Sequence, residues 1–354
     1  MPIPTEPIGS IPRPSRLLAA VGDIAAGRIS LEKFQAVEEE VLRETIAKFE
    51  ETGSPVITDG EQTKPSFATY PLSGLNNLAA DGAVIPFADG HTRQLPKLTS
   101  GPFRYSEHAV KYLTEARKFA TKPVKQAVIS PSALSLLYPQ SGIPGYPQEQ
   151  FLEDLTNEAE RDIRECLKGG AACVQIDFTE GRLALKLDPS GGVLKTFVDL
   201  NNRLLDRFSG ADRARIGVHT CPGGDHDSTH SADVDYVKLL PLLFQLHAGR
   251  FYMQLASEKD RGKVLQATRD LLQPGQTLFV GVIDPINSRV ETPEEVKDRV
   301  LEAARYIPVE RLGTTDDCGF SPFADDTSTS RETAFAKIRS RVEGTKLAAA
   351  TLGV

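Results

Sequence analysis

A histidine and two cysteines carry the most distinctive chemistry in this sequence. His219 and Cys221 are separated by one residue, and Cys318 lies in the segment Asp317-Cys318-Gly319. Residues two apart on a strand point to the same side, so His219 and Cys221 can reach a single ion. Imidazole and thiolate are the usual ligands of Zn²⁺, which binds four ligands, or three and a substrate. The pattern predicts a zinc site, whereas the alternative interpretation makes the cysteines inert core residues.

Further polar side chains stand where apolar runs of the sequence end. These side chains are Asp59 and Glu61, Asp177, Gln254, Asp284, and Asp316 with Asp317. In a barrel of parallel strands such ends meet on one face, and active sites lie there. A single acid at a strand end is explained as well by capping of the next helix. The repetition of polar groups over several strand ends favours a shared site.

Short apolar runs rich in β-branched residues predict the strands that position these groups. Continuous runs of this kind are typical of strands buried on both faces of a parallel sheet. The predicted strands are Pro7–Ser10, Ser54–Glu61, Lys125–Ser132, Ala172–Phe178, Ala214–Cys221, Arg250–Ala256, Thr277–Asp284 and Glu310–Cys318.

Segments with helical spacing of apolar residues separate most of these strands. The predicted helices are Leu31–Thr52, Pro147–Gly169, Gly191–Ser209, Asp233–His247, Glu258–Leu272, Thr292–Tyr306 and Arg331–Leu347. Alternating strands and helices predict an α/β fold, a (β/α)₈ TIM barrel formed by residues 1–354 as a single domain. Residues 62–105 break the alternation with many Pro, Gly and Asp residues, and we expect an elaborated loop or hairpin over the barrel mouth.

Composition limits the classes of partner. The chain has 354 residues and a formal net charge of −7, without a basic stripe, which argues against nucleic-acid binding. No apolar run reaches the length of a membrane span, so we expect no membrane partner. The four cysteines are few and widely spaced, which favours a reducing, cytoplasmic location over a disulfide framework. A homo-oligomer is compatible with the sequence.

Five motifs in the same order resemble the C-terminal catalytic barrel of cobalamin-independent methionine synthases and the stand-alone members of that family. The resemblance covers nearly the whole chain. The matching segments are Ile8-Gly9-Ser10 with Pro12-Arg13-Pro14, Thr58-Asp59-Gly60-Glu61, Gln175-Ile176-Asp177, His219-Thr220-Cys221, and Asp317-Cys318-Gly319.

The resemblance implies a zinc-dependent methyltransferase of methionine biosynthesis. His219, Cys221 and Cys318 match the family's zinc ligands, and the family's zinc binds the thiol of homocysteine. Zinc deprotonates a coordinated thiol, and the thiolate is the nucleophile. By position, Ser10 and Glu61 with Asp177 would bind the amino-acid end of the acceptor.

Three differences from the family pattern concern the metal and the methyl donor. Gln254 stands where the family has a further glutamate ligand, so we consider it a fourth, weaker ligand. The chain contains no tryptophan, whereas the synthases place one against the pterin ring of methyltetrahydrofolate. The family's histidine after the seventh strand is also missing, and Asp284 is the candidate for its role in proton transfer.

The segment after Cys221 resembles instead the epoxyalkane:coenzyme M transferases, in which a zinc-activated thiol opens an epoxide. It reads Cys221-Pro-Gly-Gly-Asp-His-Asp-Ser-Thr-His230. His230 is a candidate general acid for the leaving alkoxide, or a cap for a helix that begins near Asp233. Epoxide opening is therefore an alternative to methyl transfer. A uroporphyrinogen-decarboxylase-like enzyme and a non-catalytic barrel are further alternatives.

Overall fold

The computed structural model describes residues 3–354. Its centre is a sheet of six parallel strands, which runs in the order β12-β11-β10-β7-β6-β5. The strands are β5 (Gln126–Ile129), β6 (Val174–Asp177), β7 (Ile216–Thr220), β10 (Arg250–Met253), β11 (Thr277–Ile283) and β12 (Leu312–Asp316). All but the first residues of β10 and β11 are buried, as expected for strands covered on both faces.

Two extended segments close the sheet into a barrel. Thr5 forms a parallel bridge to Thr314 of β12, and Ile57 forms one to Val124 just before β5. The amide of Ile11 donates to the carbonyl of Gly60 over 3.0 Å and joins the two segments. The predicted (β/α)₈ barrel is thus confirmed, although its first two strands are reduced to single bridges.

The first bridge lies at Thr5 rather than within the predicted strand Pro7–Ser10. Pro4 and Pro7 lack an amide hydrogen, so a regular ladder of hydrogen bonds cannot run through this segment. Glu6, which lies between them, donates its amide to the carbonyl of Thr314 over 3.0 Å.

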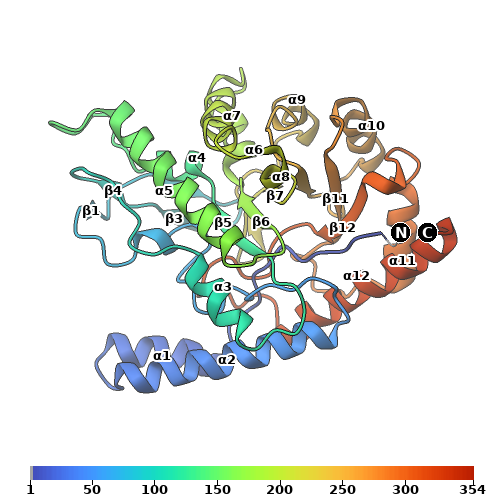
Figure 1. Ribbon diagram of the computed structural model, residues 1–354, viewed down its shortest axis with the longest axis horizontal. Coiled ribbons are helices and arrows are strands. Elements are labelled where there is room, and N and C mark those ends of the chain that lie inside the picture. Colours follow the sequence, from blue (N-terminus) through green and yellow to red (C-terminus); the bar gives the residue numbers. More distant parts are fainter. Residues whose placement is uncertain (1–2) are drawn as a thin grey trace.

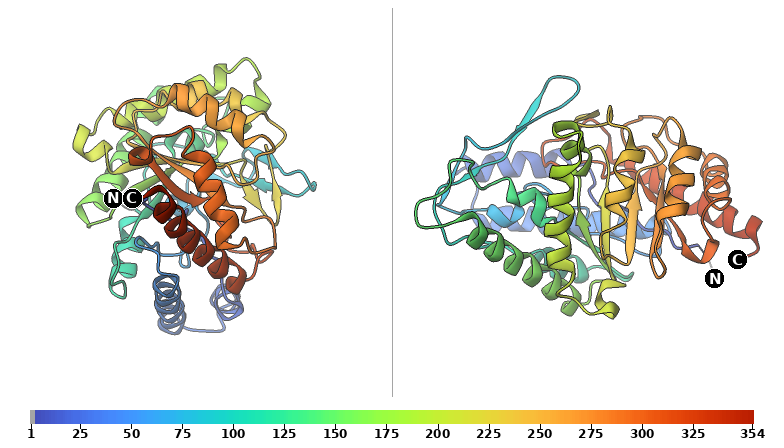
Figure 2. Two further views of the ribbon diagram at one scale, coloured as in Figure 1. Left: turned by 90° about the vertical axis from the view of Figure 1, so that its right-hand side faces the viewer. Right: turned by 90° about the horizontal axis from the view of Figure 1, so that it is seen from above.

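Helices cover the outside of the barrel, as Figures 1 and 2 show. Those that match predicted segments are α2 (Leu31–Glu51), α5 (Gln148–Lys168), α7 (Gly192–Leu205), α10 (Arg261–Leu271), α11 (Pro293–Ala303) and α12 (Arg331–Leu352). The sequence analysis did not predict α1 (Ser15–Ala25), α3 (Val110–Arg117), α4 (Pro131–Ser135), α6 (Glu180–Leu187) or α8 (Gly210–Arg213). Within residues 3–354, no helix is both long enough and apolar enough to cross a bilayer.

At two places the observed elements differ from the predicted ones because of a proline. The predicted helix Asp233–His247 is wrong as a continuous element, because only the 3₁₀ turn η2 (Tyr236–Lys238) and the short helix α9 (Leu240–Leu243) form there. Pro241 in α9 has no amide hydrogen to continue the preceding turn. The strand predicted up to Ser132 ends at Ile129, since Ser130 caps α4 and Pro131 begins it.

Residues 62–105 form the expected elaborated hairpin region. The strand β1 (Leu78–Ala79) pairs with β4 (Lys97–Leu98), and β2 (Val84–Pro86) pairs with β3 (Thr92–Gln94). We call residues 84–94 the rim hairpin; it is the cyan hairpin that projects from the barrel in the right-hand view of Figure 2. The amide of Ala88 donates to the carbonyl of Thr229 over 3.0 Å, which ties the hairpin to the segment after β7.

A buried arginine holds three segments of the barrel mouth together. The Nη1 of Arg13 donates to the carbonyls of Ser321 (2.6 Å) and Phe323 (3.3 Å). Its Nη2 donates to the carbonyls of Glu61 (2.5 Å) and Lys64 (3.0 Å). The planar guanidinium matches this fan of acceptors, which a lysine ammonium cannot reproduce. Arg13 therefore fixes the first two barrel segments against the loop after β12.

We expect Arg13→Lys to lower the free energy of unfolding by about 3 kcal/mol, because buried carbonyls lose their donors. Urea denaturation measures this change. Arg28→Lys is the matched control, since Arg28 is exposed and pairs with Asp23 over 2.7 Å at the surface; it should cost less than about 0.5 kcal/mol. An Arg13→Lys protein as stable as the parent would show that these hydrogen bonds of Arg13 do not stabilise the fold.

Candidate active site

His219, Cys221 and Cys318 come together at the mouth of the barrel. Each offers one ligand atom, and these atoms lie within 4.8 Å of one another. His219 lies on β7, Cys221 follows the last residue of that strand, and Cys318 stands two residues after β12. The two sulfur atoms are 3.1 Å apart, and all three residues are buried.

The polar atoms of this group fit a metal cation. Both ring nitrogens of His219 are buried without a hydrogen-bond partner, although such atoms are costly to bury unpaired. The thiol of Cys221, whose sulfur lies 3.1 Å from that of Cys318, lowers the pKa of Cys318, and the nearby His219 acts in the same direction. The interaction with Cys318, together with burial, raises the pKa of Cys221. Two cysteine sulfurs thus lie beside an imidazole with free lone-pair capacity, which is the donor set that zinc prefers.

The turn after Cys221 brings His230 against this group. Gly223 adopts a φ of 70°, and a Cβ atom on it would lie 1.8 Å from Nε2 of His230. Glycine is required here both by the left-handed backbone and by the approach of the imidazole. The Gly223 amide also donates to the sulfur of Cys221 over 3.4 Å.

The cavity beside the cysteines has a volume of about 70 Å³. All three predicted substrate-binding residues line it, together with His219, His230 and Cys318. These three are Ser10, Glu61 and Asp177. The structure thus brings together the first barrel segment and residues from the ends of the second, fourth, fifth and eighth barrel segments.

Two buried carboxyls that line this cavity have raised pKa values. Burial raises the pKa of Glu61 to about 7, although Lys64, whose Nζ lies 3.3 Å from Glu61 Oε1, acts in the opposite direction. Burial also raises the pKa of Asp177, which accepts a hydrogen bond of 2.7 Å from the amide of Gln175. A ligand cation that enters the cavity would therefore stabilise the ionised forms of both acids.

The structure does not bring Gln254 into the metal-ligand group. Its Oε1 accepts a hydrogen bond of 3.0 Å from Arg182, and its Nε2 donates one of 2.7 Å to Ser257. Both ends of the amide are thus occupied by other partners. Gln254 faces a separate groove outside the cavity of His219 and Cys318.

Asp284 lies in the same separate groove as Gln254. Its Oδ1 accepts from the amide of Ile286 over 3.1 Å, and its own amide donates to Glu291 over 2.9 Å. Burial raises the pKa of Asp284. The carboxylate thus serves the turn after β11, and no contact places it at the cavity.

His230 lines the cavity but does not cap a helix. The next helical turn, η2, is capped by Asp235, so the capping alternative is wrong. Burial lowers the pKa of His230 to about 4, and the positive charges of the nearby Lys186 and Arg182 contribute to this shift. Its Nδ1 is buried without a hydrogen-bond partner. The imidazole is therefore neutral at pH 7 and holds no second proton to transfer.

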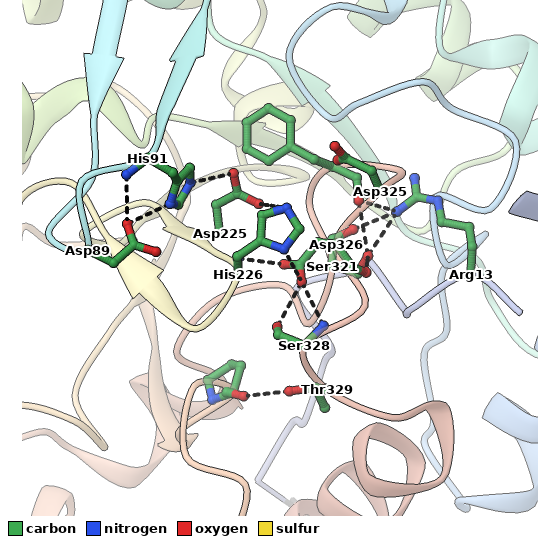
Figure 3. A network of polar contacts seen from close by, with 12 residues as sticks. Arg13, Asp89, His91, Asp225, His226, Ser321, Asp325, Asp326, Ser328 and Thr329 are labelled. Atoms are coloured by element: carbon green, nitrogen blue, oxygen red, sulfur yellow. Dashed lines mark hydrogen bonds and ion pairs between the residues drawn. The ribbon is translucent and has the colours of Figure 1, made fainter. Parts of the chain in front are cut away.

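The sequence analysis missed a polar network at the rim of the cavity. Asp225, His226 and Asp326 form a second group with metal-ligand spacing, and Figure 3 shows His226 between the two acids. Arg93 of the rim hairpin already supplies a cation here, with Nε 2.5 Å from Asp225 and Nη2 2.8 Å from Asp325. No spacing in the sequence links position 93 to position 225, so this network had no sequence signal.

Comparisons with known proteins agree in fold and family. The family model for the catalytic domain of cobalamin-independent synthase matches residues 3–346. The methionine synthase of Sulfurisphaera tokodaii is 23% identical and the alignment covers 98% of this chain and 92% of the relative. The uncharacterized protein YxjH of Bacillus subtilis is 24% identical, with 96% and 92% covered. The structure of a B12-independent methionine synthase from Shewanella sp. W3-18-1 in complex with selenomethionine superposes with a TM-score of 0.76 at 18% identity, covering 99% of both chains.

We expect the buried His230 to make stability depend on pH. Its pKa is about 4 in the folded protein and 6.5 in the unfolded chain, so the unfolded chain binds more protons between these values. Stability therefore falls as the pH drops from 7 to 5, by about 2 kcal/mol from this residue. Urea denaturation at both pH values should show a smaller loss for His230→Gln than for the parent. Equal losses would show that His230 is not buried in its neutral form.

Proposed function

The chain belongs to the family of cobalamin-independent synthase catalytic domains, and on this premise we propose that it is a zinc-dependent S-methyltransferase. Its acceptor is homocysteine or a homocysteine-like thiol. The observation that carries the proposal is the convergence of His219, Cys221 and Cys318 at the cavity, with both nitrogens of the imidazole unpartnered.

His219, Cys221 and Cys318 would hold the zinc ion. Three protein ligands leave one of the four usual positions for a substrate, which is typical of a catalytic rather than a structural site. Bound zinc would supply the Lewis acidity that keeps the acceptor's sulfur deprotonated at neutral pH. The chain's own contribution is to bury this sulfur away from competing water.

Glu61 and Asp177 would bind the ammonium group of the acceptor. Both line the cavity, and both lose solvation that a cation could replace. Ser10 stands beside them, and its hydroxyl accepts a hydrogen bond of 3.1 Å from the amide of Ser321. This contact fixes the Ser10 side chain at the cavity wall and leaves its proton available for the acceptor's carboxylate.

The predicted proton donors do not support a step that needs a strong acid. His230 is neutral at pH 7, and Asp284 lies in another groove. Opening of an epoxide produces an alkoxide that must receive a proton, so the site does not favour this alternative. The family membership and the named relatives do not favour the decarboxylase-like or the non-catalytic alternative either. The cytoplasmic location and the oligomeric state stay predictions.

We expect about one zinc ion per chain in protein purified without chelator, and its loss in Cys221→Ser and in Cys318→Ser. Elemental analysis by mass spectrometry measures the ratio. Cys166→Ala is the matched control, because Cys166 is buried elsewhere and should leave the zinc content unchanged. A parent protein without zinc after reconstitution under reducing conditions would contradict the proposed function.

We expect Glu61→Gln to weaken the binding of homocysteine by about 10- to 100-fold, because a charge-assisted hydrogen bond to the ammonium group is lost. Calorimetric titration of the zinc-loaded protein measures the change. The matched ligand is 4-mercaptobutyrate, which lacks only the amino group and should bind the variant and the parent equally. A similar loss for both ligands would place Glu61 at the thiol rather than at the ammonium group.

A further inference from the structure

A second chamber of about 370 Å³ adjoins the cavity of the cysteines. The two share part of their walls, including His230 and Thr179. The chamber lies between the loop 65–69, the rim hairpin, α4 and the first turns of α6. Most of its lining is apolar, with Phe67, Ile85, Leu95, Ile129, Leu136 and Leu183 among the residues. A methyl transfer needs a donor next to the acceptor, and this chamber has the position and the volume for one.

Glu180 is a buried acid in the wall of this chamber. It is the first residue of α6 and is only 5% exposed. Its Oε1 accepts a hydrogen bond of 2.6 Å from the hydroxyl of Ser130 and another from that of Ser132. Its Oε2 is buried and has no partner, and Glu180 forms no ion pair within residues 3–354. Burial raises the pKa of Glu180 to about 7, so a cation in the chamber would stabilise its ionised form.

The other charged groups of the chamber do not supply that partner. Among the described residues that line it, Arg93 is the one arginine or lysine. Arg93 is occupied by Asp225 and Asp325, at 2.5 and 2.8 Å. The acids that line the chamber, Glu180 and Asp325, therefore outnumber its one cationic side chain, Arg93, and this imbalance favours a cationic occupant.

Resting on the proposed function, we propose that this chamber binds the alkyl donor and that the donor is an onium cation, a methylated ammonium or sulfonium, held opposite Glu180. The acceptor's thiolate attacks the donor's methyl carbon and forms the new S–C bond. The bond from that carbon to the positive nitrogen or sulfur breaks, and its electron pair neutralises the departing atom. This reaction requires no proton, in agreement with a cavity whose histidine is neutral.

Binding of three small probes tests the charge preference on the unmodified protein. Tetramethylammonium and trimethylsulfonium are compared with tert-butanol, a neutral molecule of similar size, by calorimetric or NMR titration. We expect both cations to bind about tenfold more tightly than the alcohol, because a buried carboxylate favours a cation. Equal or weaker binding of the cations would overturn the proposal. The titration needs neither zinc nor thiol, so its failure is distinguishable from failure of the proposed function.

Variants test the assignment to Glu180. Glu180→Gln keeps the size and the acceptor oxygen for the serines, and should abolish the cation preference while the affinity for tert-butanol stays the same. Glu38→Gln on α2 removes one acid that does not line the chamber and is the control for net charge. If Glu180→Gln still preferred the cations to tert-butanol, the role of Glu180 would be overturned. Loss of this preference in Glu38→Gln would show a non-specific effect of net charge, which would overturn that role as well.

Methyl transfer to the thiol distinguishes the two kinds of onium donor. With zinc-loaded protein and homocysteine, dimethyl sulfide from trimethylsulfonium identifies a sulfonium donor, and trimethylamine from tetramethylammonium identifies an ammonium donor. Gas chromatography detects both products. Methyl transfer from neither cation would overturn the assignment of the chamber to an onium donor.

Discussion

The rest of the site depends on the burial of an imidazole that has no hydrogen-bond partner among residues 3–354. His219 lies on a central strand with both nitrogens shielded from water and unbonded. A buried polar atom without a partner costs about 1–3 kcal/mol, so the fold accepts a local penalty that a bound cation would remove. The cysteine sulfurs lie 3.1 Å apart, and a cation between them would allow both to ionise. This cost supports the proposal that the mouth of the barrel holds an ion.

The residues that the sequence could place are those fixed by the strands themselves. Alternation along β7 puts His219 and Cys221 on one side, and the parallel order of the sheet brings the end of β12 to the same face. Gln254 could not be placed in this way, because it lies just beyond the last residue of β10 and its direction is set by Arg182. Arg182 belongs to α6, a helix that the periodicity of the sequence did not reveal.

The same reasoning explains why Glu180 and Arg93 were missed. An acid at the start of a helix normally stabilises the helix dipole at the surface, and nothing in the sequence marks Glu180 as buried. Its environment depends on the serines around Pro131, where an expected strand gives way to α4. Arg93 is placed by a hairpin whose contacts lie 132 residues or more away in sequence. Barrel strands were thus predictable from local patterns, whereas the walls of the chambers depend on loop contacts that have no local pattern.

A low-dielectric site suits the reaction that the charges favour. A thiolate and an onium cation carry opposite charges that disappear as the new bond forms, so the transition state is less charged than the separated reactants. Water stabilises the separated ions more strongly than it stabilises that transition state, and its exclusion therefore lowers the barrier. In the proposed reaction, carboxylates would hold each cation in place: Glu61 and Asp177 the acceptor's ammonium group, and Glu180 the donor. The donor would bind as a cation and leave as a neutral molecule. Its attraction to Glu180 would therefore end with the transfer, which favours release from the chamber.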